Sequence, residues 1–175
     1  MNVLILPGIG NSGPDHWQSH WQQLNTHYVR VNQLDWDNPN CSDWLIALEE
    51  RVHSAGPNTV LVAHSLACLL VAQWAARTTL QIKAALLVAV PNPASAIFPV
   101  QAVGFSPVPT QPLPFKSTVI ASTDDPYGGI AYAEECASYW GSTLVNIGEA
   151  GHINSASGLG AWHAGHELLQ SIQAN

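Results

Sequence analysis

The feature that most limits how this chain can fold is an alternation of short apolar runs with helical patterns. The apolar runs occupy residues 3–6, 28–32, 59–63, 84–89, 117–122 and 143–147, and most lack polar alternation. Continuous apolarity is expected of strands that are buried on both faces. The helical patterns occupy residues 15–25, 42–55, 66–78, 130–140 and 155–173. We therefore predict an α/β fold, doubly wound in three layers, with about six parallel strands and helices on both faces.

Residues 91–116 depart from this alternation. The segment contains more than half of the 12 prolines and one candidate short helix near residues 94–98. Because strands flank it, we expect a stiff insertion over the active-site edge of the sheet, within a single domain of residues 1–175. We also expect Pro14 in the first turn of the first helix and Ser42 as the cap of the second.

The charge pattern and the length of the apolar runs exclude two classes of partner. The net charge is −7 and the five basic residues are scattered, so we expect no binding to nucleic acid. The apolar runs are far shorter than the roughly 20 residues that cross a bilayer, so we expect no membrane association.

No signal peptide is visible before the first strand. Cys41, Cys68 and Cys136 form no C-x-x-C pattern, which favours reduced thiols and a cytoplasmic location.

Ser65 lies where the apolar run 59–63 meets the helical pattern that follows it. A serine on a sharp strand-to-helix turn projects its hydroxyl out of the backbone, and the turn accepts only small residues nearby. The usual motif is G-x-S-x-G, and here Ala63 and Ala67 replace the two glycines. Since a serine before a helix is commonly a cap, a role as nucleophile requires a base and an acid elsewhere in the chain.

Two other loops carry those groups. His152 lies in GEAGHIN after the last apolar run, and Asp124 and Asp125 lie in ASTDDPY after the preceding run. The carboxyl ends of parallel strands share one edge of a sheet, so we expect these side chains to meet Ser65. The order Ser, Asp, His along the chain is that of α/β-hydrolases. The spacing does not distinguish Asp124 from Asp125 as the acid, and Glu149 is a less favoured third candidate.

An acyl-transfer site also needs two backbone N–H groups that face the developing oxyanion. The elbow geometry makes the N–H of Leu66 one donor. The loop PGIGNSG after the first strand supplies the other, with Ile9 favoured and Gly10 as the alternative. We expect His64 to support the site rather than act as the base, because the neighbour of the nucleophile projects elsewhere.

The segments LPGIGNSGPDHWQSHW, VAHSLACLLVAQWA, GFSPVPTQPLPF, ASTDDPY and GEAGHIN resemble the small serine hydrolases typified by retinoblastoma-binding protein 9 and the bacterial YdeN-type proteins. The resemblance runs from residue 3 to about residue 170. It implies a reduced α/β-hydrolase fold with no large lid. It also implies Ser65 as the nucleophile, His152 as the base and Asp125, directly before Pro126, as the acid, which decides between the two aspartates.

His16 and Asp124 are expected to have supporting roles. The HW pair of the family suggests that His16 packs the first helix near the site, and Asp124 is expected to stabilise its own turn. His16 and His20, like His163 and His166, are spaced for one helix face. No carboxylate set or H-E-x-x-H motif completes a metal site there, so we expect no metal and no cofactor.

One motif competes with the hydrolase hypothesis. The dinucleotide-binding pattern G-x-G-x-x-G, between a strand and a helix, is matched by Gly8-Ile9-Gly10-Asn11-Ser12-Gly13. Asp35 and Asp37 are poorly placed for the acid that binds the ribose, and Pro14 suggests that the helix begins only after the third glycine. A dinucleotide-binding oxidoreductase is therefore one alternative function, and a non-catalytic binding module on the same fold is another.

The favoured hypothesis is an esterase-like serine hydrolase. It would cleave a carboxylic ester, thioester or amide through an acyl-enzyme with a Ser-His-Asp triad. The expected partners are small-molecule or peptide acyl substrates, and the sequence does not indicate the oligomeric state.

Overall fold

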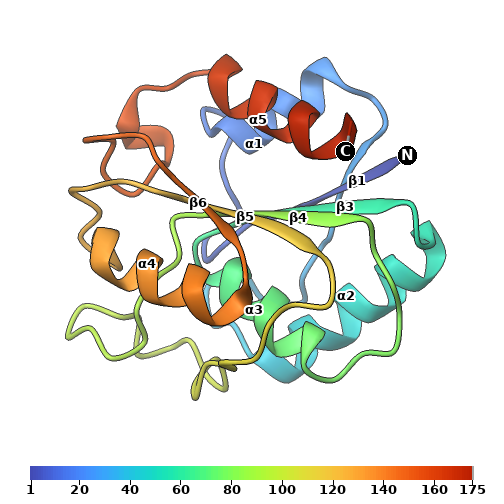
Figure 1. Cartoon of the computed structure of the whole chain (residues 1–175), viewed down its shortest axis with the longest axis horizontal. Helices are drawn as coiled ribbons and strands as arrows, with labels where there is room; N and C mark the ends of the chain where they lie inside the picture. The colour runs from blue at the N-terminus through green and yellow to red at the C-terminus, as the bar shows by residue number, and fades with distance from the viewer. Residues whose placement is uncertain (175) are drawn as a thin grey trace.

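The computed structural model of the protein describes residues 1–174 and is built on a parallel sheet of six strands (Figure 1). The strands are β1 (Asn2–Leu6), β2 (Tyr28–Arg30), β3 (Thr59–His64), β4 (Ala84–Val88), β5 (Lys116–Ala121) and β6 (Thr143–Asn146). Their order across the sheet is β2-β1-β3-β4-β5-β6, and every neighbouring pair is parallel. The predicted strands are confirmed, and their carboxyl ends meet at one edge of the sheet.

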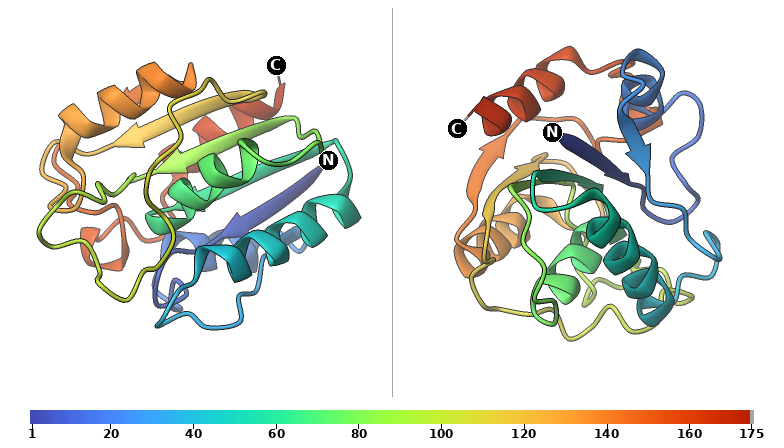
Figure 2. Two further views of the ribbon diagram at one scale, coloured as in Figure 1. Left: turned by 90° about the horizontal axis from the view of Figure 1, so that it is seen from below. Right: turned by 90° about the vertical axis from the view of Figure 1, so that its right-hand side faces the viewer.

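Helices cover both faces of this sheet, as predicted. One face carries α2 (Cys41–Ala55), α3 (Leu66–Ala75) and α4 (Gly129–Trp140), and the other carries α1 (Trp17–Leu24) and α5 (His163–Ala174) (Figures 1 and 2). The fold is therefore the predicted three-layer, doubly wound arrangement.

The central strand β3 shows why the apolar runs lack polar residues. All of its residues are buried. Leu61 and Ala63 belong to the core under α2, α3 and α4, whereas Val60 and Val62 belong to the core under α1 and α5. A strand between two helix layers buries both of its faces, so apolar side chains are favoured at every position.

Two predicted helices differ from the structure. The predicted last helix, residues 155–173, is divided into a 3₁₀ turn, η1 (Ser155–Ser157), and α5. Gly158 and Gly160 between them have φ values of 67° and 55°, left-handed conformations that end a helical turn. The segment 94–98 forms turns and bends rather than a helix.

The starts of two helices were also predicted wrongly. His16 caps α1, because its Nδ1 accepts a hydrogen bond from the backbone N–H of Gln18 at 3.2 Å, and Pro14 lies before the helix. Asn40 rather than Ser42 caps α2, because Asn40 Oδ1 accepts the backbone N–H of Ser42 at 2.9 Å. In each case the side chain satisfies an N–H group of the first turn that has no partner within the helix.

The proline-rich segment between β4 and β5 is fastened to the helices beneath it. Gln73 Nε2 of α3 donates to the carbonyl oxygen of Pro107 at 2.7 Å. Trp140 Nε1 of α4 donates to the carbonyl oxygen of Pro109 at 2.9 Å. These bonds hold the segment against the body of the fold, so it forms no separate lid.

Candidate active site

Ser65 occupies a sharp turn between β3 and α3. Its φ of 55° and ψ of −124° lie outside the regions that residues with a side chain favour. Its backbone N–H donates to the carbonyl oxygen of Val88 at 2.9 Å. Its side chain makes no capping hydrogen bond to α3. The hydroxyl is therefore not used as a helix cap.

Small residues surround this turn. Ala63 and Ala67 are completely buried. A Cβ atom built on Gly8 would lie 3.0 Å from Ser65 Cβ and 3.0 Å from the carbonyl oxygen of His64. The loop after β1 therefore packs directly on the turn, and a side chain at position 8 would displace the turn by a few tenths of an ångström. Alanine in place of glycine at positions 63 and 67 does not prevent the turn from forming.

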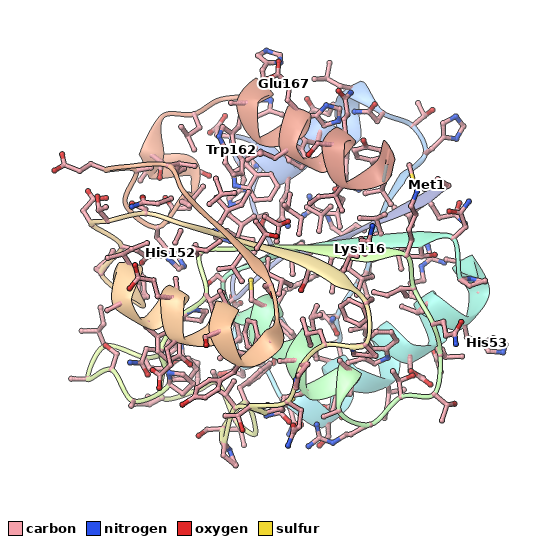
Figure 3. All side chains as sticks on the ribbon, viewed as in Figure 1. Met1, His53, Lys116, His152, Trp162 and Glu167 are labelled. Carbon is pink, nitrogen blue, oxygen red and sulfur yellow. The ribbon has the colours of Figure 1, made fainter. Side chains whose placement is uncertain are left out.

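Ser65, His152 and Asp125 form one continuous hydrogen-bonded arrangement. His152 Nε2 lies 2.7 Å from Ser65 Oγ, and His152 Nδ1 lies 2.9 Å from each carboxylate oxygen of Asp125. A carboxylate accepts the Nδ1–H, so the neutral ring presents an unprotonated Nε2 to the serine hydroxyl. The three side chains come from the loops after β3, β5 and β6, and Figure 3 shows His152 beside the edge where the strands end.

Asp124 bonds to the backbone of the loop that carries His152, and it does not bond to the imidazole of His152. Its Oδ1 accepts three hydrogen bonds, from Ser122 Oγ at 2.6 Å and from the backbone N–H groups of Gly151 at 2.8 Å and Ala150 at 2.9 Å. The bond from Ser122 is the largest cause of the lowered pKa of the Asp124 carboxyl. The contact with the imidazole belongs to Asp125.

Two further side chains fix the main chain of the same loop. His64 Nε2 donates to the carbonyl oxygen of His152 at 2.9 Å. Trp17 Nε1 donates to the carbonyl oxygen of Ile153 at 2.8 Å. Ile153 has a φ of 47°, a left-handed conformation that β-branched residues rarely adopt. The surrounding contacts therefore hold this loop in a strained conformation.

His16 and His64 form a pair of buried imidazoles next to His152. The ring centroids of His16 and His64 are 4.6 Å apart, and those of His64 and His152 are 5.1 Å apart. Burial, with the nearby positive charge of Arg30, lowers the pKa of His16 to about 4. Burial also lowers the pKa of His64 well below its ordinary value. Both rings are neutral at pH 7, so neither places a positive charge beside His152.

The start of α3 and the loop after β1 carry the two candidate N–H donors. Leu66 is the first residue of this helix, where N–H groups have no partner within the helix. A Cβ atom on Gly8 would lie 3.4 Å from the Leu66 nitrogen, and Ile9, the next residue, lines the same cavity as Leu66. The N–H of Gly10 donates to the carbonyl oxygen of Trp36 at 3.0 Å. This bond favours Ile9 over Gly10 as the second donor toward an oxyanion.

Arg30 of β2 fixes the shape of the loop after β1. Its guanidinium donates to the carbonyl oxygens of Asn11 at 3.0 Å and Ser12 at 3.2 Å, and to Asn11 Oδ1 at 2.8 Å. It also donates to Ser19 Oγ of α1 at 2.8 Å. Asn11 and Ser12 have φ values of 62° and 33°, so this side chain stabilises an otherwise unfavourable backbone.

A cavity of about 410 Å³ opens over Ser65. One group of lining residues is apolar or aromatic: Ile9, Leu66, Pro91, Phe98, Pro99 and Tyr127. A second group is small or polar: Gly10, Ser12, Gly13, His16, Asn154, Ser155 and Ala156. The described lining residues include no Asp, Glu, Lys or Arg. The cavity therefore suits an uncharged ligand.

The family model for serine hydrolases matches residues 3–171. The chain belongs to the serine hydrolase family. The predicted membership in a family of serine hydrolases is thereby confirmed. Among curated proteins, none matches the sequence of this serine hydrolase.

Solved structures of other proteins share the fold of this serine hydrolase. A YdeN-like hydrolase from Pectobacterium atrosepticum is 28% identical with a TM-score of 0.88, over 99% of this chain and 90% of that chain. The ydeN gene product of B. subtilis is 21% identical with a TM-score of 0.84, over 99% of each chain. RedJ, a thioesterase of the prodiginine pathway in Streptomyces coelicolor, is 17% identical with a TM-score of 0.60, over 95% of this chain and 90% of that chain.

The glycine-rich loop of this serine hydrolase does not form a dinucleotide-binding turn. That turn places the start of a helix against a pyrophosphate group. Here α1 begins only at Trp17, after the cap His16 and well beyond Gly13. Gly8 instead packs on the turn of Ser65. The loop geometry fits an oxyanion loop.

Sequence reasoning missed two contributors to the site of this hydrolase. The ring centroid of Tyr127 lies 4.5 Å from that of His152, and the backbone N–H of Tyr127 donates to Asp125 Oδ1 at 2.9 Å. Tyr127 follows the predicted acid Asp125 by two residues, and this proximity in the sequence could have identified it. Arg30 was also missed, because a basic residue on a short strand does not indicate which loop it holds. Glu149, the outside candidate for the acid, is exposed.

One histidine of each spaced pair has a structural partner in the serine hydrolase. His16 caps α1, and His166 Nε2 lies 2.9 Å from the hydroxyl of Tyr28. Within residues 1–174, His, Cys, Asp and Glu side chains do not gather in groups of three that could hold a metal ion. In the same part of the chain, no helix has the length and apolar character required to span a membrane.

Proposed function

We propose that the protein hydrolyses a carboxylic ester, thioester or amide through an acyl-enzyme, with Ser65 as nucleophile, His152 as base and Asp125 as the acid. The observation that carries this proposal is the 2.7 Å distance from Ser65 Oγ to His152 Nε2, with Asp125 at 2.9 Å from His152 Nδ1. An alcohol is a weak nucleophile unless a positioned base removes its proton as it attacks.

The reaction proceeds in two halves. Ser65 Oγ attacks the acyl carbon while its proton passes to His152, and the N–H groups of Leu66 and Ile9 stabilise the oxyanion of the tetrahedral intermediate. His152 then donates the proton to the leaving alcohol, thiol or amine, which departs. A water molecule, deprotonated by His152, releases the acid from Ser65. Asp125 stabilises the imidazolium in both halves.

The cavity limits the class of substrate. Its volume of about 410 Å³ holds a small acyl group, and its uncharged lining favours an uncharged one. Phe98 and Pro99 supply an apolar wall for the acyl group. Because RedJ is a thioesterase with the same fold, thioesters belong in a substrate panel beside esters and amides.

A fluorophosphonate probe and a substrate panel test the proposal. We expect the probe to label the wild-type protein and not Ser65→Ala. We expect the wild-type protein to hydrolyse at least one of a short-chain p-nitrophenyl ester, an acyl thioester and an aminoacyl amide. A protein that is folded but neither labelled nor active would be a binding module instead, and Ser65→Ala that retained turnover would exclude Ser65 as nucleophile.

We also propose a cytoplasmic location. Cys41, Cys68 and Cys136 are free and buried. Burial raises the pKa of Cys41 and of Cys136 to about 11, so these thiols remain protonated. Unpaired thiols are typical of a reducing compartment. Fractionation of cells that express the tagged protein tests this location.

A further inference from the structure

Two loops near the cavity carry exposed hydrophobic side chains. Ile97, Val100 and Val103, in the segment after β4, are 51%, 95% and 58% exposed, and Leu34, after β2, is 86% exposed. We call these four residues the apolar rim. Single exposed hydrophobic residues are common on proteins, whereas a group of them indicates a binding surface.

Backbone hydrogen bonds join the two loops to each other and join one of them to a lining residue of the cavity. The N–H of Val103 donates to the carbonyl oxygen of Pro39 at 3.0 Å. The N–H of Cys41 donates to the carbonyl oxygen of Val103 at 2.9 Å. The N–H of Gly10, a lining residue, donates to the carbonyl oxygen of Trp36 at 3.0 Å. Figure 2 (left) shows the loops side by side, in light blue and yellow-green.

Two residues of the apolar rim flank the wall of the cavity in the sequence. Phe98 and Pro99 line the cavity. Their neighbours on either side, Ile97 and Val100, are exposed. Exposed apolar residues therefore directly adjoin, along the chain, the residues that form the wall of the cavity.

The charge pattern selects an uncharged, aliphatic ligand for this surface. No charged residue lies between Lys83 and Lys116. Covering the segment therefore removes no ion from water. Asp35 and Asp37 follow Leu34 closely, and their negative charges disfavour an anionic membrane or an anionic ligand. A hydrocarbon chain is the ligand that gains most from such a surface.

We propose that the apolar rim binds the distal part of an aliphatic acyl chain whose carbonyl group lies at Ser65. This inference rests on the proposed function and specifies its substrate class. The cavity takes the carbonyl group and the first carbons, and the rest of the chain lies across Ile97 and Val100. The substrates are esters or thioesters of slender, straight-chain acids that are too long for the cavity alone.

The test is a chain-length series of p-nitrophenyl acetate, butyrate and octanoate at concentrations below micelle formation. The rim variants are Ile97→Ser and Val100→Ser, and the matched control is Ile46→Ser, which replaces a 60% exposed residue of α2. We expect kcat/KM of the wild-type protein to rise from butyrate to octanoate. Since one buried methylene contributes about fourfold to an equilibrium, we expect each rim variant to lower the octanoate-to-butyrate ratio about threefold or more. Hydrolysis of acetate, and the ratio in Ile46→Ser, should not change.

Equal octanoate-to-butyrate ratios in the wild-type protein and both rim variants would overturn the proposal. Sedimentation velocity supplies a second readout: rim variants that dissociate an oligomer while keeping the wild-type ratio would show a contact between copies of the chain, which also overturns it. If the wild-type protein cleaves no ester or thioester and is not labelled by the fluorophosphonate, the proposed function itself fails, and this result differs from a change in chain-length preference alone.

Discussion

His64 Nε2 lies 2.9 Å from the carbonyl oxygen of His152, so the residue before Ser65 holds the main chain of the residue that faces Ser65. The strand end that sets the position of the hydroxyl thus also sets the position of the imidazole. We predict that His64→Phe, which keeps a ring but loses the donor, lowers kcat about 10- to 100-fold with little change in KM, because a misplaced catalytic group slows the chemical step. Steady-state kinetics on one p-nitrophenyl ester measures this.

His64→Gln is the matched variant, since an amide N–H can restore the bond to the carbonyl oxygen. Its kcat should lie between those of His64→Phe and the wild-type protein. A rise in KM with an unchanged kcat would show that His64 contacts substrate rather than positioning His152.

The two neighbouring aspartates should differ sharply in their effect on catalysis. Asp125→Asn should lower kcat about 10⁴-fold, because an amide cannot hold the imidazole tautomer that leaves Nε2 free to accept a proton. Asp124→Asn retains an oxygen for the N–H groups of Ala150 and Gly151, so its kcat should fall by less than about tenfold. Comparable losses of kcat in the two variants would contradict the assignment of Asp125 as the acid.

Gly8→Ala should impair the site without a large loss of stability. The added Cβ would lie 3.0 Å from Ser65 Cβ and from the carbonyl oxygen of His64, so the turn must shift by a few tenths of an ångström. We expect kcat/KM to fall at least about tenfold, through displaced reacting groups. Gly13→Ala is the control, because its Cβ would meet nothing within 4 Å. A similar fall in both variants would point to loop flexibility instead.

The backbone of Ser65 should make the wild-type residue unfavourable for stability. Its φ of 55° favours glycine. We therefore expect Ser65→Gly to be more stable than Ser65→Ala by about 1 kcal/mol, since both lack the hydroxyl and only glycine relieves the backbone strain. Urea unfolding of the two inactive variants measures the difference, and equal midpoints would show that the turn is unstrained.

Acid should destabilise the fold through His16. Its pKa is about 4 in the folded protein against 6.5 for the free side chain. Between these values the unfolded chain binds more protons than the folded one, so the free energy of unfolding falls as the pH is lowered from 6.5 to 4. The loss is on the order of 3 kcal/mol.

His16→Asn keeps an acceptor for the N–H of Gln18 and removes the titrating ring. Urea unfolding at several pH values between 7.5 and 4 should therefore show a weaker pH dependence for this variant than for the wild-type protein. His64 contributes with the same sign, because its pKa is also lowered by burial. Parallel curves for the two proteins would contradict the role of His16.

The order of strands and the loops that carry Ser65 and His152 could be predicted from local patterns. Buried parallel strands lack polar residues, and the loops that follow them share an edge, so the chain order alone brought these groups together. The choice between Asp124 and Asp125 could not be made in this way. Adjacent side chains on a turn point in different directions, and the direction depends on backbone angles that spacing does not encode.

Helix limits were predicted less well because their signals are tertiary. Nothing local shows that His16 rather than a serine or aspartate caps α1, since the cap depends on where the loop after β1 places the imidazole. The division of residues 155–173 depends on Gly158 and Gly160 adopting left-handed backbone. Glycine permits that conformation without requiring it, so periodicity alone predicted one continuous helix.

The guanidinium of Arg30 binds the loop that carries Ile9 from a strand of three residues at the margin of the sheet. If the N–H of Ile9 stabilises the oxyanion as proposed, part of the entropic cost of placing that donor is met during folding, before any substrate binds. A substitution of Arg30 should therefore lower kcat before it lowers the stability of the fold.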